Sequence, residues 1–369
     1  MKIVHAFLRD LGGEFSSDLF KELPQKLGES IPEPVSKIYS DYFVATGLAP
    51  VRIRRSVEKV RFDKGSAELT THLKLFNYGV VLFEYMLTLD GGLLTIEEMA
   101  RLSTINLETR GLQTFEALFK DDLTRIEPIL REGVRKEYEI KIFNDHFVAY
   151  LDDTQREPDQ AVSLLLPQMF DPSAPARRHG ISQISVGEER DYMFLLGQRA
   201  YIAPIPDSHD ILNFLELSRV QLYELKIYDY ILDRAIENTY QFLDQLPREE
   251  SILPLAWLRR DYKQRISHVL RLTEIRMDLV DLVKDITNTS KVTDDPFFAT
   301  LYRNLNDTFQ VSSWFQSVRD KIDEIDSAQK VIMERIDLSR ATALEMTIII
   351  LILIEIVMPL FQFVSSHFF

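Results

Sequence analysis

The chain has 369 residues, of which 46% are hydrophobic and 27% charged, with 13 glycines and 15 prolines. This composition excludes wholesale disorder and collagen-like repetition. Its 57 acidic and 43 basic side chains give a formal net charge of −14, which argues against nonspecific wrapping of nucleic acid by the whole surface. Cysteine is absent, so disulfides, thiolate nucleophiles, iron–sulfur clusters and Cys-ligated zinc are excluded.

Residues 1–204 contain short apolar or alternating stretches that are typical of strands, and the helical patterns between them do not strictly alternate with the strands. We therefore expect an α+β domain rather than a doubly wound sheet. The strands are predicted at Val51–Ile53, Val57–Phe62, Tyr78–Met86, Tyr138–Ile142, Phe147–Leu151 and Tyr192–Ile202, with Asn144 and Asp145 as a hairpin turn.

Two helices are expected inside this domain. Thr95 and Glu98 form a capping box at the start of the first helix, and apolar spacing predicts a second helix over Phe115–Leu130. The segment Asp152–Asp191 is rich in proline and is predicted to be a long irregular insertion.

Residues 208–346 are predicted to be all-helical. A long helix begins at Asp207 or Ser208 and stops at Pro247, and a second helix is capped by Ser251. The stretch Thr287–Pro296 has the composition of a loop, and a shorter helix follows it.

The last part of this helical region, residues 310–345, repeats apolar positions at spacings of three and four, which predicts a helical stalk. Gln329 lies on the apolar stripe and can fix register or stoichiometry. The stripe can serve an oligomer or can pack within its own chain, and we expect a bundle that also forms homo-oligomers. The stalk seam consists of Val318, Ile322, Ile325, Gln329, Ile332 and Ile336.

Residues 347–364 read TIIILILIEIVMPLFQFV and are apolar on every face. As a helix they span about 27 Å, close to the ~30 Å hydrocarbon layer of a bilayer. A buried core helix or a strand is the alternative. We expect a single transmembrane helix, which the whole-chain mean hydropathy of −0.10 conceals by averaging.

The flanking charges predict the orientation of this membrane helix. Lys330, Arg335 and Arg340 precede the apolar run, and neither Lys nor Arg follows it. Positive residues stay on the cytoplasmic side, so we expect a tail-anchored protein whose N-terminal domain is cytoplasmic or on the equivalent side of an organelle.

Glu355 lies at the centre of the apolar run, where a carboxylate costs about 2.5–3.5 kcal/mol on insertion scales. It is either a contact between helices of an oligomer or a tolerated, protonated residue. Pro359, one turn later, favours a helix that packs against another helix. We expect Glu355 and Pro359 to contact the membrane or another copy.

The familiar motifs of nucleotide, nucleophile and metal sites do not occur in the sequence. Asp207, His209 and Asp210 coincide with a helix start, where capping explains the acids. We therefore expect neither catalytic residues nor a metal or cofactor. An enzyme with an unrecognised site in the N-terminal domain is the third hypothesis for function.

A run of basic residues stands out in this acidic chain and would form a possible anion-binding patch. It could hold a phosphate, an RNA backbone or an acidic partner, or it could pair internally with the excess acids. Aromatic residues are not interleaved on the same face, so nucleic acid is expected only if this patch binds it. The patch consists of Arg52, Arg54, Arg55, Lys59 and Arg61, and continues to Lys64.

Several segments together have a recognisable pattern: FNYGVVLFEYM at 76–86, FLELSRVQLYELKIYDYILD at 214–233, DDPFFATLYRNLND at 294–307, the charged stalk after it and the run IIILILIEIV. In these segments the chain resembles the required-for-meiotic-nuclear-division family, which includes sporulation-related fungal membrane proteins and mitochondrial members linked to organelle translation. It covers residues 70–369. The resemblance implies a membrane-anchored oligomeric scaffold and supplies no catalytic residues.

The sequence therefore predicts a tail-anchored, oligomeric membrane scaffold that recruits a protein partner whose identity it does not reveal. The alternative is a divalent-cation channel of CorA-like architecture, because such channels also place an α/β domain before long helices. That alternative predicts two spans and a Gly-Met-Asn signature, whereas here there is one span and Met358 is followed by Pro359.

Overall fold

The structure, a computed structural model, describes residues 1–16, 22–23, 26–27, 31–33, 36–47, 49–62, 65–89, 104–107, 112–135, 144–153, 157–165, 182–185, 192–203, 207–245, 267, 273, 277 and 289–368. The chain forms two compact units. The first contains Met1–Ile227 and Lys284–Trp314, and the second contains Tyr228–Val283 and Phe315–Phe369.

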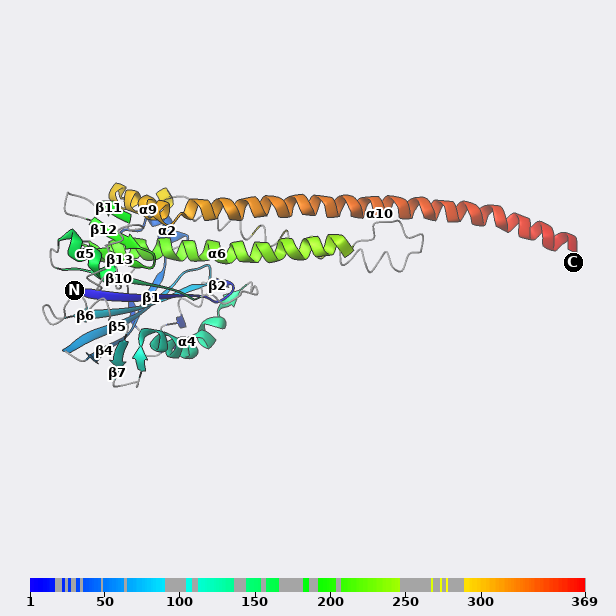
Figure 1. Cartoon of the computed structure of the whole chain (residues 1–369). Helices are drawn as coiled ribbons and strands as arrows, with labels where there is room; N and C mark the ends of the chain where they lie inside the picture. The colour runs from blue at the N-terminus through cyan, green and yellow to red at the C-terminus, as the bar shows by residue number, and fades with distance from the viewer. Residues whose placement is uncertain are drawn as a thin grey trace, which may run out of the picture. The chain divides into compact units, whose positions relative to one another are not determined.

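A large sheet organises the first unit (Figure 1). In the described part of the chain its order is β11-β12-β13-β10-β1-β6-β5-β4-β7-β8, with β3 beside β4. Neighbours are antiparallel except for the parallel pair of β10 and β13. The strands are β1 Lys2–Asp10, β3 Ile31–Glu33, β4 Val51–Phe62, β5 Gly65–Leu75, β6 Val80–Leu89, β7 Thr104–Leu107, β8 Leu112–Thr114, β10 Asn144–Leu151, β11 Ser182–Ser185, β12 Tyr192–Leu196 and β13 Arg199–Ile202.

A separate pair of short strands, β2 Glu14–Phe15 and β9 Val134–Arg135, lies outside the large sheet. The helices are α2 Asp41–Ala45, α4 Phe115–Arg131, α5 Pro158–Leu165, α6 Ser208–Gln245, α8 Thr289–Val292, α9 Pro296–Thr308 and α10 Val311–Phe368. An N-terminal domain of strands and helices with a large sheet, followed by C-terminal helices, is therefore confirmed.

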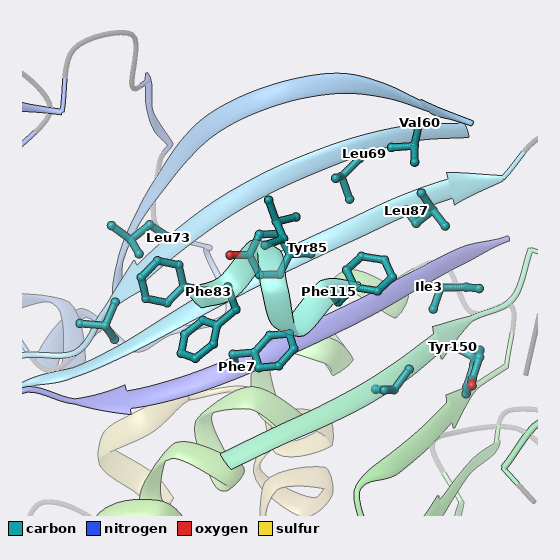
Figure 2. Packing of buried hydrophobic residues seen from close by; sticks show 14 of the residues in the cluster. Ile3, Phe7, Val60, Leu69, Leu73, Phe83, Tyr85, Leu87, Phe115 and Tyr150 are labelled. Carbon is teal, nitrogen blue, oxygen red and sulfur yellow. The ribbon is translucent and has the colours of Figure 1, made fainter. Parts of the chain in front are cut away.

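Helices pack on both faces of the sheet. Successive side chains of a strand point to opposite faces, so each strand contributes to both. On one face, Phe7 of β1 stacks on Phe119 of α4 with ring centroids 4.8 Å apart. The hydroxyl of Tyr85 on β6 donates to Asp122 of α4 at 3.0 Å. Figure 2 shows this apolar cluster, which is the main hydrophobic core. The beginning of α6 packs on the opposite face.

Several predicted strands are confirmed with changed limits. The two strands predicted between Val51 and Phe62 form the single strand β4, with a register shift between Arg54 and Ser56. The stretch Tyr192–Ile202 forms two strands, β12 and β13, around a turn where Gly197 has a φ of +55°. The predicted strand at 138–142 lies outside the described residues.

The hairpin turn predicted at Asn144 and Asp145 is wrong. Both residues belong to β10, where they pair with Arg9 and Leu8 of β1. The local turn preference of Asn-Asp is overridden because extension of β10 completes its backbone pairing with a long central strand.

The helix at 115–130 is confirmed as α4, and its N-cap Thr114 accepts a hydrogen bond from the Ala117 amide at 3.0 Å. The segment 152–191 is not wholly irregular, because it contains α5 and β11. The short helix α8 lies in the predicted loop 287–296. The helices predicted after Thr95 and after Ser251 fall outside the described residues, apart from isolated positions in the second.

The long helix after Asp207 is confirmed as α6, which ends at Gln245. The stalk helix is also confirmed, since α10 continues without a break from Val311 to Phe368. Within the part of the chain that is described, however, we find no helix long and apolar enough to cross a lipid bilayer. Side-chain description on α10 ends at Pro359.

The junction between α9 and α10 is made by Gln310, which has a left-handed backbone with φ of +55°. This conformation costs a residue with a Cβ about 1–2 kcal/mol, whereas glycine adopts it freely. We expect Gln310→Gly to raise the urea midpoint slightly and Gln310→Val to lower it, because a β-branched side chain fits this region worst. Equal losses in both variants would contradict this ordering.

Candidate functional sites

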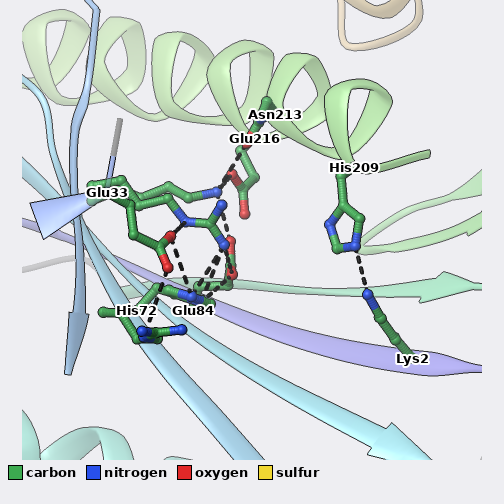
Figure 3. Close-up of polar contacts among 10 residues, drawn as sticks. Lys2, Glu33, His72, Glu84, His209, Asn213 and Glu216 are labelled. Carbon is green, nitrogen blue, oxygen red and sulfur yellow. Dashed lines mark hydrogen bonds and ion pairs between the residues drawn. The ribbon is translucent and has the colours of Figure 1, made fainter. Parts of the chain in front are cut away.

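Charged side chains gather where α6 meets the sheet (Figure 3). Strand register brings them together: His72 of β5 pairs with Glu84 of β6, and Lys74 of β5 pairs with Arg52 of β4. These side chains share the sheet face on which Glu216 of α6 lies. We name the set of Glu33, Arg52, His72, Lys74, Glu84 and Glu216 the buried ionic cluster.

Lys74 is the centre of the buried ionic cluster. Its Nζ atom lies 2.6 Å from Glu84 Oε2, donates to Glu216 Oε2, and donates to Asn213 Oδ1 at 3.1 Å. Lys74, Glu84 and Glu216 are 2%, 0% and 1% exposed. Removing such charges from water is expensive, so the cluster is stable only while its members compensate one another.

Two further members of the cluster, His72 and Arg52, contact Glu84, and Arg52 is partly exposed to solvent. His72 Nδ1 lies 2.7 Å from Glu84 Oε1, and Arg52 Nη2 lies 3.2 Å from the same oxygen. Arg52 Nε also lies 3.1 Å from Glu33 Oε2. The cluster therefore extends from a dry interior to Arg52 and Glu33, whose side chains are about one quarter exposed.

The two carboxyls beside Lys74 have opposite pKa shifts. Burial alone would raise the pKa of Glu84, but the charges of Lys74, His72 and Arg52 outweigh burial and hold it well below its usual range. Burial raises the pKa of Glu216 to about 8; Lys74 opposes the rise and Glu84 adds to it. These opposite shifts favour an ionised Glu84 and a proton on Glu216 at neutral pH.

A second polar contact joins α6 to the end of β1. The Asp10 amide donates to the Tyr223 hydroxyl at 3.2 Å, and Asp10 Oδ1 accepts from the Gly12 amide at 2.8 Å. Glu224 is 0% exposed, and in the described structure neither of its carboxyl oxygens has a hydrogen-bond partner. Burial raises the pKa of Glu224 well above its ordinary value, and the nearby charge of Asp10 adds a smaller rise.

An imidazole pair lies on the other face of the sheet. His5 Nδ1 and His146 Nε2 are 3.2 Å apart, and the His5 ring stacks on Phe115 with centroids 3.8 Å apart. Burial lowers the pKa of His146 to about 4. No group of three His, Asp or Glu residues in the described ranges could hold a metal ion. The half-buried His146 ring also stacks on Phe7 of β1, with ring centroids 4.2 Å apart.

The predicted basic patch is divided by the structure. Arg52 and Arg54 lie beside Glu33, with Nε–O distances of 3.1 and 3.8 Å. Past the register shift in β4, Lys59 is exposed and pairs across the strands with Glu68. Arg55 lies at the register shift, and the side chains of Arg61 and Lys64 are outside those described. For Arg52 and Arg54, internal pairing with acids is what the structure shows.

The stalk seam is buried within its own chain. Val318, Ile325 and Ile332 are each at most 1% exposed, and Ile322 and Gln329 are also buried. Gln329 donates to the hydroxyl of Thr273 at 3.3 Å. The side chain of Ile336 is not among those described.

Beside the seam, Lys321 lies 2.8 Å from Asp229 and 2.6 Å from Asp233 of α6. In the described residues, the apolar stripe of α10 therefore packs within its own chain.

The apolar end of α10 is exposed, in contrast to the buried stalk seam. Every side chain from Ile348 to Met358 except Glu355 is apolar, and each of these is between 47% and 64% exposed. Glu355 is exposed among them, and Pro359 lies inside the helix. The helix therefore ends in an apolar surface that its own described neighbours do not cover.

The buried ionic cluster was not predicted from the sequence. Its residues lie on five separate elements, and their spacing along the chain carries no motif. The available signal was weak: one acid, Glu84, in the apolar strand VVLFEYMLTL, and Glu216 in an apolar stretch of α6. A buried acid of this kind needs a nearby cation or must carry a proton.

No curated protein and no solved structure matches the chain. Nothing in the comparisons connects the chain with the meiotic-division family or with CorA-type channels, which its sequence resembles. A family model covers β1 to α5, and therefore all strands of the buried ionic cluster but not α6. Over residues 1–166 the chain matches this model, which is described as "Uncharacterized protein MJ0711, N-terminal domain".

Proposed function

We propose that the protein is a membrane-tethered scaffold whose N-terminal domain is held at the surface of a bilayer by the end of α10. The observation that carries this proposal is the exposed apolar run Ile348–Met358. Proteins in water rarely expose continuous apolar surface of this extent. A partner helix would cover one stripe, whereas a bilayer covers every face of the run.

In the sequence the apolar run continues past Pro359, where the description of side chains ends, and its full length and its flanks support a bilayer tether. Residues 347–364 span about 27 Å as a helix, close to the ~30 Å hydrocarbon layer. Lys330 and Arg335 lie on α10 before the run. Their positive charges favour an orientation in which the N-terminal domain stays on the cytoplasmic side, or its equivalent in an organelle.

Glu355 supports a homo-oligomer within this membrane proposal. A carboxyl at the bilayer centre costs about 2.5–3.5 kcal/mol unless it finds a partner. A second copy in the same orientation presents the same carboxyl at the same depth, and Pro359 frees a backbone carbonyl nearby. Because the stalk seam is occupied within the chain, the exposed run is the better contact between copies. The domain at the surface would then present a partner-binding surface in several copies.

Liposome flotation tests the tether. The full chain is expected to float with liposomes and to resist extraction by alkaline carbonate. The double variant Ile350→Asp with Leu353→Asp should remain in the aqueous fraction, because two carboxylates at the centre of the run cost about 5 kcal/mol or more. A chain ending at residue 340 should also remain aqueous.

The matched control is Val331→Asp with Leu338→Asp, two exposed apolar positions on the same helix before the run. This control should float like the unmodified chain, and circular dichroism should show equal helix content in both double variants. If the unmodified chain stays in the aqueous fraction, or if both double variants float, the tether is wrong.

A further inference from the structure

The helix α6 carries two buried carboxyls toward the sheet, and each faces another buried acid. Glu216 lies beside Glu84 at Lys74, and Glu224 lies beside Asp10. The two positions are separated by about two helical turns, or roughly 12 Å along α6. All four side chains are at most 3% exposed. Water therefore cannot screen the repulsion between like charges at either position.

The geometry at the first position favours a proton on Glu216. Glu84 is contacted by three basic groups, Lys74, His72 and Arg52, whereas Glu216 is contacted by Lys74, which it shares with Glu84. Glu216 Oε1 is buried and has no hydrogen-bond partner in the described structure. A proton on Glu216 removes the repulsion between the two carboxylates and allows Glu216 to donate to Glu84.

The second position also favours a proton, in this case on Glu224. Glu224 has two buried oxygens without hydrogen-bond partners among the described residues. The charged group that acts on it is the carboxyl of Asp10. A neutral Glu224 avoids an uncompensated buried charge, which no protein interior accommodates cheaply.

We propose that α6 is held on the sheet by a proton-dependent latch, in which Glu216 and Glu224 each carry a proton while docked and loosen α6 when both ionise. The groups that face Glu216 are Lys74 of β5, Glu84 of β6 and Tyr39. His72 of β5 and Arg52 of β4 contact Glu84, and Glu33 of β3 contacts Arg52. On α6 itself, Asp210 acts on Tyr39, and His209 lies within electrostatic range of Glu84 and Lys74. Those that face Glu224 are Asp10 of β1 and Tyr223.

The sign of the effect follows from linkage. Both pKa values are raised in the folded chain, so the folded chain binds more protons than the unfolded chain. The contribution of these two carboxyls to stability is therefore fully present below the ordinary pKa of a glutamate, and it is lost as the pH rises through their folded pKa values, about 8 for Glu216. The lowered pKa of Glu84 acts in the opposite direction, but only below its ordinary range.

Hydrogen exchange of the full chain in detergent micelles tests the latch. After correction for intrinsic exchange rates, amides of α6 around Glu216 and Glu224 should be at least about tenfold more protected at pH 6 than at pH 9. Glu216→Gln and Glu224→Gln should each reduce this pH dependence, and the double variant should abolish it. Glu237→Gln, at an exposed position of the same helix, is the control and should leave it unchanged.

Infrared spectroscopy of the unmodified chain provides a second readout that does not depend on how variants fold. Two protonated carboxyl signals should be present at pH 7 and lost as the pH rises. The latch is overturned if the double variant keeps the pH dependence of the unmodified chain, if α6 protection is independent of pH, or if the infrared spectrum shows no protonated carboxyl at pH 7.

Discussion

Replacement of Lys74 by methionine is expected to lower the free energy of unfolding by about 3–5 kcal/mol, the usual cost of removing one partner from a buried ion pair. Lys74 provides the shared cation for Glu84 and Glu216, all three of which are buried. Methionine has similar volume but no charge, so the loss reports electrostatics rather than packing. Urea unfolding of the full chain in detergent, monitored by circular dichroism, would measure it.

The loss in Lys74→Met should increase with pH, because the remaining carboxyls must ionise without their cation. A second substitution, Glu84→Gln, should restore part of the stability by removing one orphaned charge. Lys120→Met is the matched control, since Lys120 forms an exposed i,i+4 pair with Glu116 and should change stability by less than about 0.5 kcal/mol. Equal effects at Lys74 and Lys120 would contradict a structural role for the cluster.

Substitution of Gly79 by alanine is the second change with a large expected effect. Gly79 precedes β6 with φ of +97°, and a Cβ there would lie 1.8 Å from the Gly13 carbonyl oxygen. The Gly79 carbonyl also accepts a hydrogen bond from the Leu11 amide at 3.2 Å. The backbone after β1 must therefore move, and we expect a loss of more than about 3 kcal/mol.

Gly47→Ala separates the steric effect at Gly79 from the cost of a left-handed backbone. Gly47 has φ of +72°, but nothing lies within 4 Å of the position a Cβ would take. Its replacement should cost about 1–2 kcal/mol, which is the conformational term alone. Thermal unfolding of the three chains should rank unmodified above Gly47→Ala and Gly47→Ala above Gly79→Ala. A loss at Gly79 no larger than that at Gly47 would contradict the clash.

The elements with strong local patterns could be predicted from the sequence. The apolar spacing of α6 and α4 and the unbroken helix α10 are all properties of short stretches of chain. Predictions failed where tertiary pairing outweighed local preference. Asn144 and Asp145 form part of β10 because β1 supplies a partner strand for them. In the same way, the single strand β4 spans a residue run that local pattern divides in two.

The candidate sites also differ in how far they can be predicted from the sequence. The exposed apolar run at the end of α10 is visible in the sequence because eleven consecutive positions contain one charge, Glu355. The packing partner of the stalk seam could not be predicted, because a heptad stripe has the same sequence pattern whether it packs on its own chain or on another copy. Its burial, and the hydrogen bond from Gln329 to Thr273, became apparent only in the folded chain.

The sequence by itself determined that the chain has no thiol chemistry, that an N-terminal domain with strands precedes long helices, and that an apolar run lies at the end of the last helix. Which charged side chains contact one another depends on the tertiary structure. Lys74, Glu84 and Glu216 converge because strand register and the packing of α6 bring distant segments onto one sheet face. Such long-range pairing leaves no periodic mark in the sequence, since burial of a charge is set by partners far along the chain.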